Sequence, residues 1–280
     1  MKINERCADC LFERQKRLSD NKDYISEIRE IIENRKENDT SPYLVYLFNK
    51  TYEKHFGKRA SYKEINKKFN DLVLSMESSL WNKIRSSEDP LEKALLYARI
   101  GNYIDFGAMN NVDENTFLSL FEAPLLSEGD RQVYCSFKEQ CKRGKSFLLI
   151  ADNCGEIVLD KLFIRQLKEV YPQLDITVMV RGGEVLNDAS SEDAEYIGID
   201  KYARVITNGA AVSGTIYDML SDNARRALDN SDVVLAKGQG NYESLSGQGR
   251  HIFYSFLCKC DLFTSKFNVP RLTGMFVEEF

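Results

Sequence analysis

The stretch LLIADNCGEI (148–157) places a carboxylate and a carboxamide directly after an apolar run. Asp152 and Asn153 stand side by side, and the residues CGE (154–156) then lead into an amphipathic segment. Carboxylate and carboxamide oxygens are hard ligands, which suit Mg²⁺ or Mn²⁺ better than zinc. An Asp-Asn pair before a helix is also a common cap, so this stretch alone leaves both interpretations open.

Polar side chains also follow the later apolar runs of the second half. They are Arg181, Asn187 and Asp188 after the second run, Asn208 and Gly209 after the third, and Lys237 and Asn241 after the fourth. Because a parallel sheet brings the carboxyl ends of its strands to one edge, where ligands of such folds bind, we expect these side chains to lie close together. Asp188 could instead cap a following helix, so the convergence of the strand ends carries the argument.

The predicted chemistry is that of a cation and a phosphate group sharing one site. The candidate metal ligands are Asp152, Asn153 and Asp188. Few protein groups hold such an ion, so waters and phosphate oxygens complete its coordination. Gly155 and Glu156 begin a helix whose N–H groups favour a phosphate, and Lys237 would place a positive charge on the other side of that phosphate. We expect Asp152, Asp188 and Lys237 to be catalytic, and Gly155, Glu156, Arg181, Asn187, Lys237, Asn241 and Asn102 to bind substrate.

Alternating strands and helices must position these residues. The predicted strands are 147–151, 175–180, 203–207 and 232–236, with another at 251–257, and the predicted helices between them are 156–170, 191–198 and about 216–229. This alternation predicts an α/β fold with a mostly parallel sheet and helices on both faces. We therefore expect a three-layer α/β/α domain at 143–280 that carries the metal and phosphate site.

The first half, residues 1–142, is predicted to be a helical N-terminal region. Its predicted helices lie near 22–36 and 42–55, in SYKEINKKFNDLVLSMESSLW (61–81) and in DPLEKALLYARIGNYIDFG (89–107). The third opens with Ser61 and Glu64 at the spacing of a capping box. The fourth opens with Asp89 as a predicted N-cap and Pro90 in the first turn. At its end, Asn102 and Asp105 could reach the predicted site.

Composition and charge limit the class of protein. The 280 residues carry a net charge of −5 and give a pI of about 5.4, which argues against a general nucleic-acid binder. No apolar run approaches the roughly 20 residues that span a bilayer, and MKINERCADC lacks the apolar core of a signal peptide. We therefore expect a cytoplasmic protein that neither enters a membrane nor binds nucleic acid.

The seven cysteines fit thiols or metal ligands better than a disulfide framework. Cys7 and Cys10 form a CxxC, and Cys258 and Cys260 form a CxC, which together could hold a structural zinc ion. Cysteine is also a common small apolar residue, so packing or free thiols are the alternative interpretation.

Several longer stretches resemble a known family. ADNCGEIVLDKLFIRQL, LNDASSEDA, NGAAVSGT and AKGQGNYESL are similar to the family catalogued as domain of unknown function 89, now described as metal-dependent damage-control phosphatases. CADCLFERQ and GNYIDFG resemble its prokaryotic, cysteine-containing branch, so the resemblance extends from Cys7 to about Asp261. One departure is Cys154, where we expect alanine in many relatives.

The resemblance implies a fold and an activity. The fold is a helical N-terminal region beside a Rossmann-like α/β/α domain. The activity is hydrolysis of phosphate esters of small metabolites, such as sugar phosphates, with a divalent metal that is often Mn²⁺, Ni²⁺, Co²⁺ or Mg²⁺. The metal ligands of the family match Asp152, Asn153 and Asp188, and its phosphate-contacting lysine matches Lys237.

Two other functions remain alternatives at this point. One is an S-adenosylmethionine-dependent carboxyl methyltransferase, which would want a glycine-rich loop where DNCGE offers a single glycine. The other is a non-catalytic protein that binds a metal or a metabolite. For a phosphatase the nucleophile could be a water activated by the metal, or Asp152 through an aspartyl-phosphate. His55 and His251 are predicted to be surface or packing residues.

Overall fold

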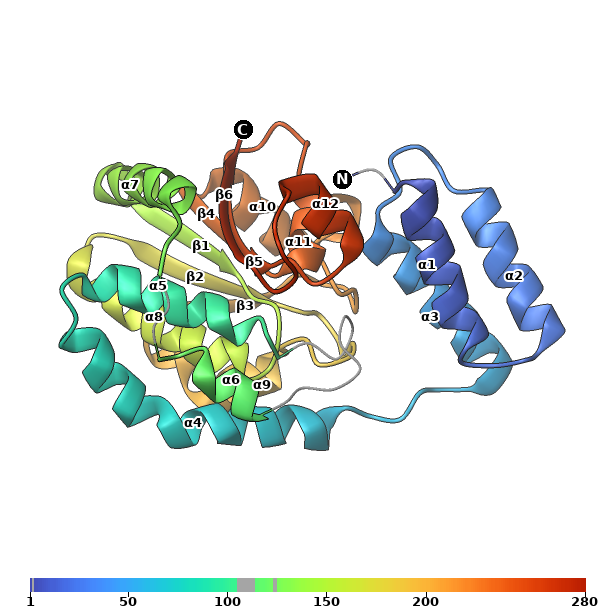
Figure 1. Cartoon of the computed structure of the whole chain (residues 1–280), viewed down its shortest axis with the longest axis horizontal. Helices are drawn as coiled ribbons and strands as arrows, with labels where there is room; N and C mark the ends of the chain where they lie inside the picture. The colour runs from blue at the N-terminus through green and yellow to red at the C-terminus, as the bar shows by residue number, and fades with distance from the viewer. Residues whose placement is uncertain (2, 105–113, 123–124) are drawn as a thin grey trace.

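A six-stranded sheet forms the centre of this computed structural model, which describes residues 1, 3–104, 114–122 and 125–280 (Figure 1). The strands are β1 (Ser146–Ile150), β2 (Asp175–Val180), β3 (Arg204–Thr207), β4 (Val233–Lys237), β5 (Ile252–Leu257) and β6 (Gly274–Glu279). Their order is β3-β2-β1-β4-β5-β6. All neighbouring pairs are parallel except β5 and β6, which are antiparallel. The prediction of an α/β fold with a mostly parallel sheet is confirmed.

The edge strand β6 was not predicted. Its sequence GMFVEE is only partly buried, apart from Phe276. A short strand at the edge, with one apolar position facing the core, lacks the continuous apolar run that marked the central strands.

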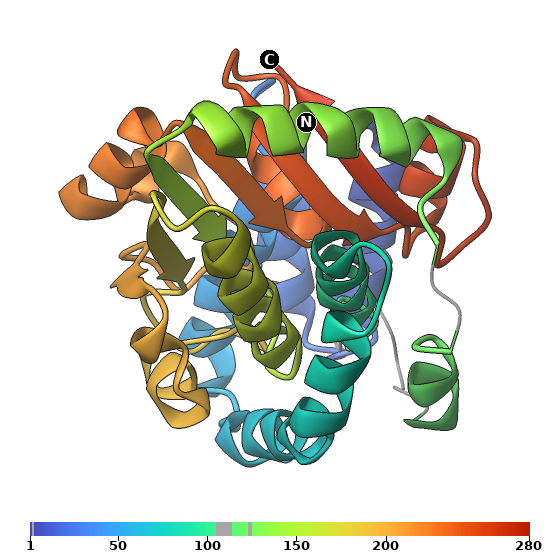
Figure 2. The same cartoon turned by 90° about the vertical axis from the view of Figure 1, so that its left-hand side faces the viewer.

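Helices cover both faces of the sheet, because side chains alternate along each strand. Phe147 and Leu149 of β1 pack with α5 (Pro90–Gly101), α7 (Glu128–Arg143) and α8 (Glu156–Val170). Leu148 and Ile150 pack with α10 (Asp222–Asn230), α11 (Gln239–Leu245) and α12 (Asp261–Phe267). Figure 2 shows α7 lying across the strands, with α5 and α8 on the same side.

The predicted helix at 216–229 is divided in two. A short 3-10 turn, η2 (Tyr217–Met219), is followed by extended backbone at Leu220 and then by α10. The Ser221 side chain accepts a hydrogen bond from the Ala224 N–H at 3.3 Å, and this N-cap starts the second helix. The shorter α9 (Ser191–Ile197) ends at Gly198, which has a positive φ of 72°.

The N-terminal helices form two groups. The helices α1 (Glu5–Lys16), α2 (Lys22–Glu33) and α3 (Ser41–Phe56) have a small core of their own, made of Leu11, Tyr24, Ile28, Leu44 and Phe48. In contrast, α4 (Lys63–Arg85), α5, α6 (Glu114–Ser119) and α7 contribute to the large core cluster on one face of the sheet. The division into domains at residue 142 stays a prediction.

The predicted capping box at the start of α4 is wrong. The helix begins at Lys63 after Tyr62, whose side chain makes no cap hydrogen bond, and Ser61 Oγ accepts from the Lys63 N–H at 3.2 Å without a reciprocal bond from Glu64. The Ser61 hydroxyl donates to Glu184 Oε1 at 2.7 Å, and the Tyr62 N–H donates to the same oxygen at 2.6 Å. Glu184 lies in the loop after β2, so the carboxylate that accepts from the N–H before this helix is distant in the sequence and is not the predicted Glu64. By contrast, Asp89 caps α5 as predicted, through the Glu92 N–H at 3.0 Å.

No helix in the described ranges is both long and apolar enough to cross a membrane.

Candidate active site

The loops after β1 and β2 are joined to each other by their backbones. Asn153 and Asp188 form an isolated antiparallel bridge. The Ala189 N–H donates to the Asp152 carbonyl at 2.7 Å, and the Cys154 N–H donates to the Asn187 carbonyl at 2.8 Å. The three predicted metal ligands therefore meet at one place on the sheet edge, although the loops that carry them are 34 residues apart in the sequence, as Asn153 and Asn187 show.

Arg181 lies between the two aspartates, and we call these three residues the arginine cluster. Its Nε donates to Asp188 Oδ2 at 2.6 Å, and its Nη2 donates to Asp152 Oδ1 at 3.0 Å. The remaining Nη1 donates to the Gly214 carbonyl and to Asn241 Oδ1, both at 3.1 Å. The guanidinium thus orients both carboxylates, because all of its nitrogens donate to protein acceptors.

Carboxamides connect Asp152 to a second set of charges. Asn102 and Asn153 donate from Nδ2 to Asp152 Oδ2 at 3.0 and 2.8 Å. The same two nitrogens donate to Glu156 Oε2 at 3.1 and 3.0 Å. Asn187 in turn donates from Nδ2 to Asn153 Oδ1 at 3.0 Å. The structure therefore brings together Asn102, Asn153 and Asn187 around the two aspartates, as the sequence predicts.

Lys237, Glu156 and Asp160 form a second group, the lysine cluster, which is completely buried. Lys237 Nζ donates to Glu156 Oε1 at 2.7 Å, to Asp160 Oδ1 at 2.6 Å and to the Ala98 carbonyl at 2.9 Å. An ammonium group has three protons to donate, so protein acceptors use them all. In this arrangement Lys237 contacts the site only through Glu156, whereas the sequence predicts a direct contact with phosphate.

Burial shifts the pKa values of this cluster. It raises the pKa of Asp160 from its ordinary value to about 7, because the charged form loses its hydration. Burial alone would lower the pKa of Lys237, but the carboxylates of Asp160 and Glu156 outweigh it and raise that pKa. Lys237 is therefore a permanent cation that holds the beginning of α8.

Two N–H groups just before α8, those of Cys154 and Gly155, have protein acceptors. The Gly155 N–H donates to Asn70 Oδ1 at 2.7 Å, and the Cys154 N–H is bonded to Asn187. Gly155 has a φ of 78°, and a Cβ there would lie 2.8 Å from Ile104 Cδ1. The glycine is thus needed for a tight turn against neighbouring helices, and its N–H is not directed at a ligand.

The charges of the two connected clusters do not balance. With every group ionised, four carboxylates (Asp152, Asp188, Glu156 and Asp160) face two cations (Arg181 and Lys237), so four minus two leaves an excess of two negative charges. A proton on Asp160, whose pKa is raised to about 7, reduces this excess to one. Buried charges need compensation. Two carboxylates and one carboxamide are also the donor types that hard divalent cations prefer. The residues present therefore fit a divalent metal ion.

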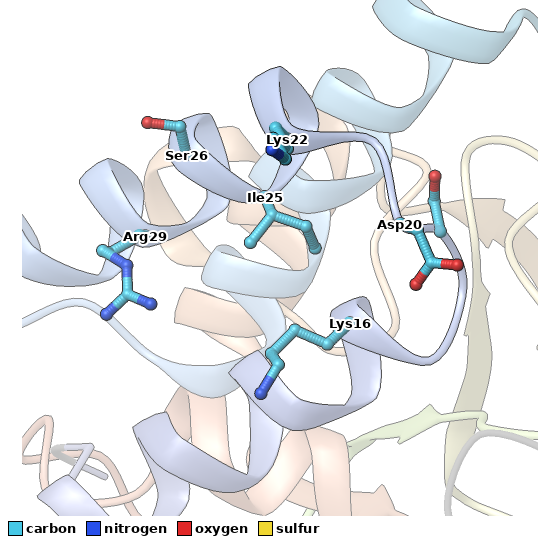
Figure 3. Close-up of a pocket in the computed structure, with 7 residues that line it drawn as sticks. Lys16, Asp20, Lys22, Ile25, Ser26 and Arg29 are labelled. Carbon is cyan, nitrogen blue, oxygen red and sulfur yellow. The ribbon is translucent and has the colours of Figure 1, made fainter.

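A cavity of about 520 Å³ opens beside the arginine cluster. Arg181 and Asp188 form part of its wall, together with Lys63, Asn66 and Lys67 of α4 and with Ser190, Ser191, Glu192, Asp193 and Tyr196 in and before α9. Its size suits a small metabolite. A second hollow of about 380 Å³ lies between α1 and α2, where Lys16, Asp20, Lys22 and Arg29 surround Ile25 (Figure 3). That hollow contains none of the predicted site residues.

Three residues in or near the site were missed by the sequence analysis. They are Asn70, Asp160 and Gly238. Asp160 follows Glu156 by one helical turn, which is a visible spacing. Gly238 has a φ of 79°, and a Cβ there would lie 1.9 Å from Asp152 Oδ2, so only glycine fits.

Of two other predicted positions, Asn208 lies away from the two clusters, whereas Asn241 contacts both of their cationic residues. Asn208 Oδ1 accepts from the N–H groups of Gly182 and Ala210 at 2.7 and 3.0 Å, so it ties the loops after β2 and β3 together. Asn241 Nδ2 donates to the Lys237 carbonyl at 2.6 Å, and its Oδ1 accepts from Arg181. Asp105 lies outside the described residues.

Among the described residues, no group of three or more His, Cys, Asp or Glu side chains is arranged to hold a metal ion. The zinc site at Cys7, Cys10, Cys258 and Cys260 stays a prediction. Cys7 Sγ lies 3.2 Å from Ser41 Oγ, and burial raises the pKa of this thiol to about 11. Cys258 is buried in the apolar cluster behind β5. Cys154 is completely buried, and burial raises its pKa as well.

Neither histidine lies on the loops that carry the predicted metal ligands. His251 Nε2 is 2.8 Å from Glu278 Oε1 on β6, and His55 on α3 lies beside Glu27.

Comparison with known proteins identifies relatives along the whole chain. The family described as the damage-control phosphatase ARMT1-like domain matches residues 2–272. A damage-control phosphatase of Archaeoglobus fulgidus is 29% identical over 273 residues, which cover 93% of each chain. An uncharacterized protein of Methanocaldococcus jannaschii is 32% identical over 209 residues, which cover 71% of this chain and 67% of that one.

The fold has a counterpart among crystal structures. A DUF89 family protein from Pyrococcus horikoshii superposes with a TM-score of 0.79 at 23% identity, and the match covers 99% of both chains. The resemblance identified from the sequence is confirmed, and so is the α/β fold class.

Proposed function

We propose that this chain, which belongs to the damage-control phosphatase ARMT1-like family, hydrolyses phosphate monoesters of small metabolites with a divalent metal ion. The relatives named damage-control phosphatases support the reaction class. One structural observation carries the metal dependence. Asp152, Asn153 and Asp188 meet at the sheet edge, where Asp188 lines a cavity, in a connected network in which four carboxylates face two cations.

The proposed metal ligands are Asp152, Asn153 and Asp188, and the proposed ion is Mn²⁺, Ni²⁺, Co²⁺ or Mg²⁺. When bound, such an ion neutralises the negative charge that builds on a phosphoryl group in the transition state. Arg181 holds Asp152 and Asp188 in one orientation through its two ion pairs. Asn102 donates to Asp152 Oδ2 and Asn187 donates to Asn153 Oδ1, so these two carboxamides orient proposed metal ligands.

Asp152 is better placed as a metal ligand than as a nucleophile. Its Oδ1 accepts from Arg181, and its Oδ2 accepts from Asn102 and Asn153. Hydrogen bonds to a carboxylate stabilise its charge and make it a weaker base and nucleophile. The same carboxylate packs against the Gly238 backbone, which restricts its movement. We therefore propose that water attacks the phosphorus.

Lys237 has a supporting role in this proposal. It holds Glu156 Oε1, while Glu156 Oε2 accepts from the carboxamides that also bind Asp152. A change at Lys237 would reach Asp152 through this chain of contacts. The positive charge that faces the phosphate must then come from the metal and from groups other than Lys237.

Phosphate release from a panel of sugar phosphates and nucleotide-derived phosphates tests the proposal. Metal-stripped protein should be assayed with each of the four ions and with EDTA. We expect turnover with the best ion to exceed that in EDTA by at least about 100-fold. Equal rates with and without metal, or no phosphate release from any ester, would contradict it. The second result would favour a protein that only binds a metabolite.

A further inference from the structure

Three polar side chains form a row along one face of α4. Lys63, Asn66 and Asn70 are spaced by three and four residues, which places them on one side of a helix. Lys63 Nζ pairs with Glu192 Oε2 of α9 at 2.6 Å. Asn70 Nδ2 donates to Asp193 Oδ1 at 3.0 Å, and Asn70 Oδ1 accepts from the Gly155 N–H. Both ends of the row are therefore bonded to the neighbouring elements.

The middle residue, Asn66, differs from its neighbours. It is 5% exposed, and its Oδ1 has no hydrogen-bond partner among the residues that the structure describes. Buried polar atoms are nearly always paired, so an unpaired carboxamide oxygen calls for a ligand or another explanation. Asn66 lines the cavity that Arg181 and Asp188 also line. The unpaired group thus lies in the wall of the proposed active site.

We propose that Asn66 determines substrate specificity by accepting a hydrogen bond from a hydroxyl group on the alcohol part of the phosphate ester. This inference rests on the proposed function, since it places the phosphoryl group at Asp188 and the alcohol part in the cavity. An oxygen acceptor discriminates for ligands that carry a donor, because a ligand without one leaves the oxygen unpaired.

The walls of the cavity favour a polar alcohol over an apolar one. Lys63, Lys67, Ser190 and Glu192 line it, and Tyr196 is its one aromatic residue among those described. Asn66 Oδ1 is shielded by protein atoms, so the carboxamide has to turn about its Cβ–Cγ bond to meet the ligand. That torsion is broad, which makes the turn easy, and it would move Oδ1 from its shielded position to the cavity, where the ligand hydroxyl supplies the missing partner.

Two esters with the same carbon skeleton test this role. Glycerol 1-phosphate carries hydroxyl groups on its alcohol part, and propyl phosphate carries none. The ratio of kcat/KM for glycerol 1-phosphate to that for propyl phosphate should fall about tenfold in Asn66→Leu and in Asn66→Ala. Asn82→Leu, at an exposed position of the same helix, is the matched control and should leave the ratio unchanged.

The outcomes separate this inference from the proposed function. If the wild type hydrolyses both esters but neither Asn66 variant changes the ratio, the specificity role is overturned and the phosphatase stands. If the wild type releases phosphate from no ester with any metal, the proposed function fails and the role of Asn66 fails with it. The alanine variant keeps the test valid if the leucine variant does not fold.

Discussion

The arginine cluster and the lysine cluster each consist of one cation between two carboxylates, but their surroundings differ. Arg181 and Asp188 line a cavity, and the aspartates of that cluster are 6–7% exposed. Lys237, Glu156 and Asp160 are completely buried between β4, α5 and α8. One cation between two carboxylates can therefore form part of a ligand site in one place and stabilise the fold in another.

The difference concerns access to a ligand. Carboxylates beside a cavity can exchange a protein partner for a metal ion or a substrate, whereas enclosed carboxylates cannot. Breaking an enclosed pair leaves an uncompensated charge and destabilises the fold. We therefore expect changes in the arginine cluster to affect activity and changes in the lysine cluster to affect stability.

The largest effect is expected for Asp188→Asn. This change removes one negative charge from the proposed metal ligands and keeps the shape of the side chain. Metal-dependent phosphate release should fall by roughly 10³-fold. Asp200→Asn, at an exposed position, is the control and should retain full activity. An Asp188→Asn variant with wild-type turnover would remove the site from consideration.

Lys237→Met tests the other side of the comparison. Two buried carboxylates would lose their shared cation, so the free energy of unfolding should decrease by about 3–5 kcal/mol. Urea denaturation measures this, and Lys83→Met on the surface of α4 should change stability by less than about 0.5 kcal/mol. A Lys237→Met protein that is as stable as the wild type but inactive would instead support the direct phosphate contact predicted from the sequence.

Gly238→Ala should misplace Asp152. The new Cβ would lie 1.9 Å from Asp152 Oδ2, so the carboxylate has to move. A misplacement of about 1 Å in an active site can lower turnover by about 100-fold, and we expect a loss of that order here. Gly247→Ala is a matched control, because Gly247 has a similar φ of 73° and no heavy atom within 4 Å of its Cβ position. Equal activities of the two variants would show that Asp152 does not need its present position.

The smallest effect concerns pH. Burial raises the pKa of Asp160 from 3.8 to about 7, so the folded protein binds a proton that the unfolded chain releases. The stability from this proton is complete below pH 3.8 and is lost as pH rises through about 7. Between pH 5 and 8, the unfolding free energy of the wild type should therefore fall by roughly 2 kcal/mol relative to Asp160→Asn.

Urea denaturation of both proteins in EDTA at the two pH values measures this difference. A constant difference would mean that Asp160 is ionised throughout and that Lys237 compensates it fully.

The convergence of Asp152, Asn153 and Asp188 at the sheet edge could be predicted from the sequence because each strand ended at a visible change from apolar to polar residues. Asp152 and Asp188 follow β1 and β2, which are neighbours in the sheet. Lys237 was misplaced by one residue. It is the last residue of β4 rather than the first of the loop, so it shares a face with Val233 and Leu235 and points toward α8.

Other features depend on contacts that no local pattern contains. The approach of Gly238 to Asp152 brings together loops from two strands, and the capping of α4 by Glu184 spans 122 residues. The unpaired oxygen of Asn66 depends on how α4 packs against α9 and the loop before α8, which the sequence of α4 does not contain.

Calorimetric titration of Mn²⁺ into metal-stripped protein tests the central claim most directly, because it needs no substrate. We predict that the wild type binds one ion per chain and that Asp188→Asn binds it at least about tenfold more weakly. A wild type that binds no divalent ion, or an Asp188→Asn variant that binds it equally well, would contradict the account.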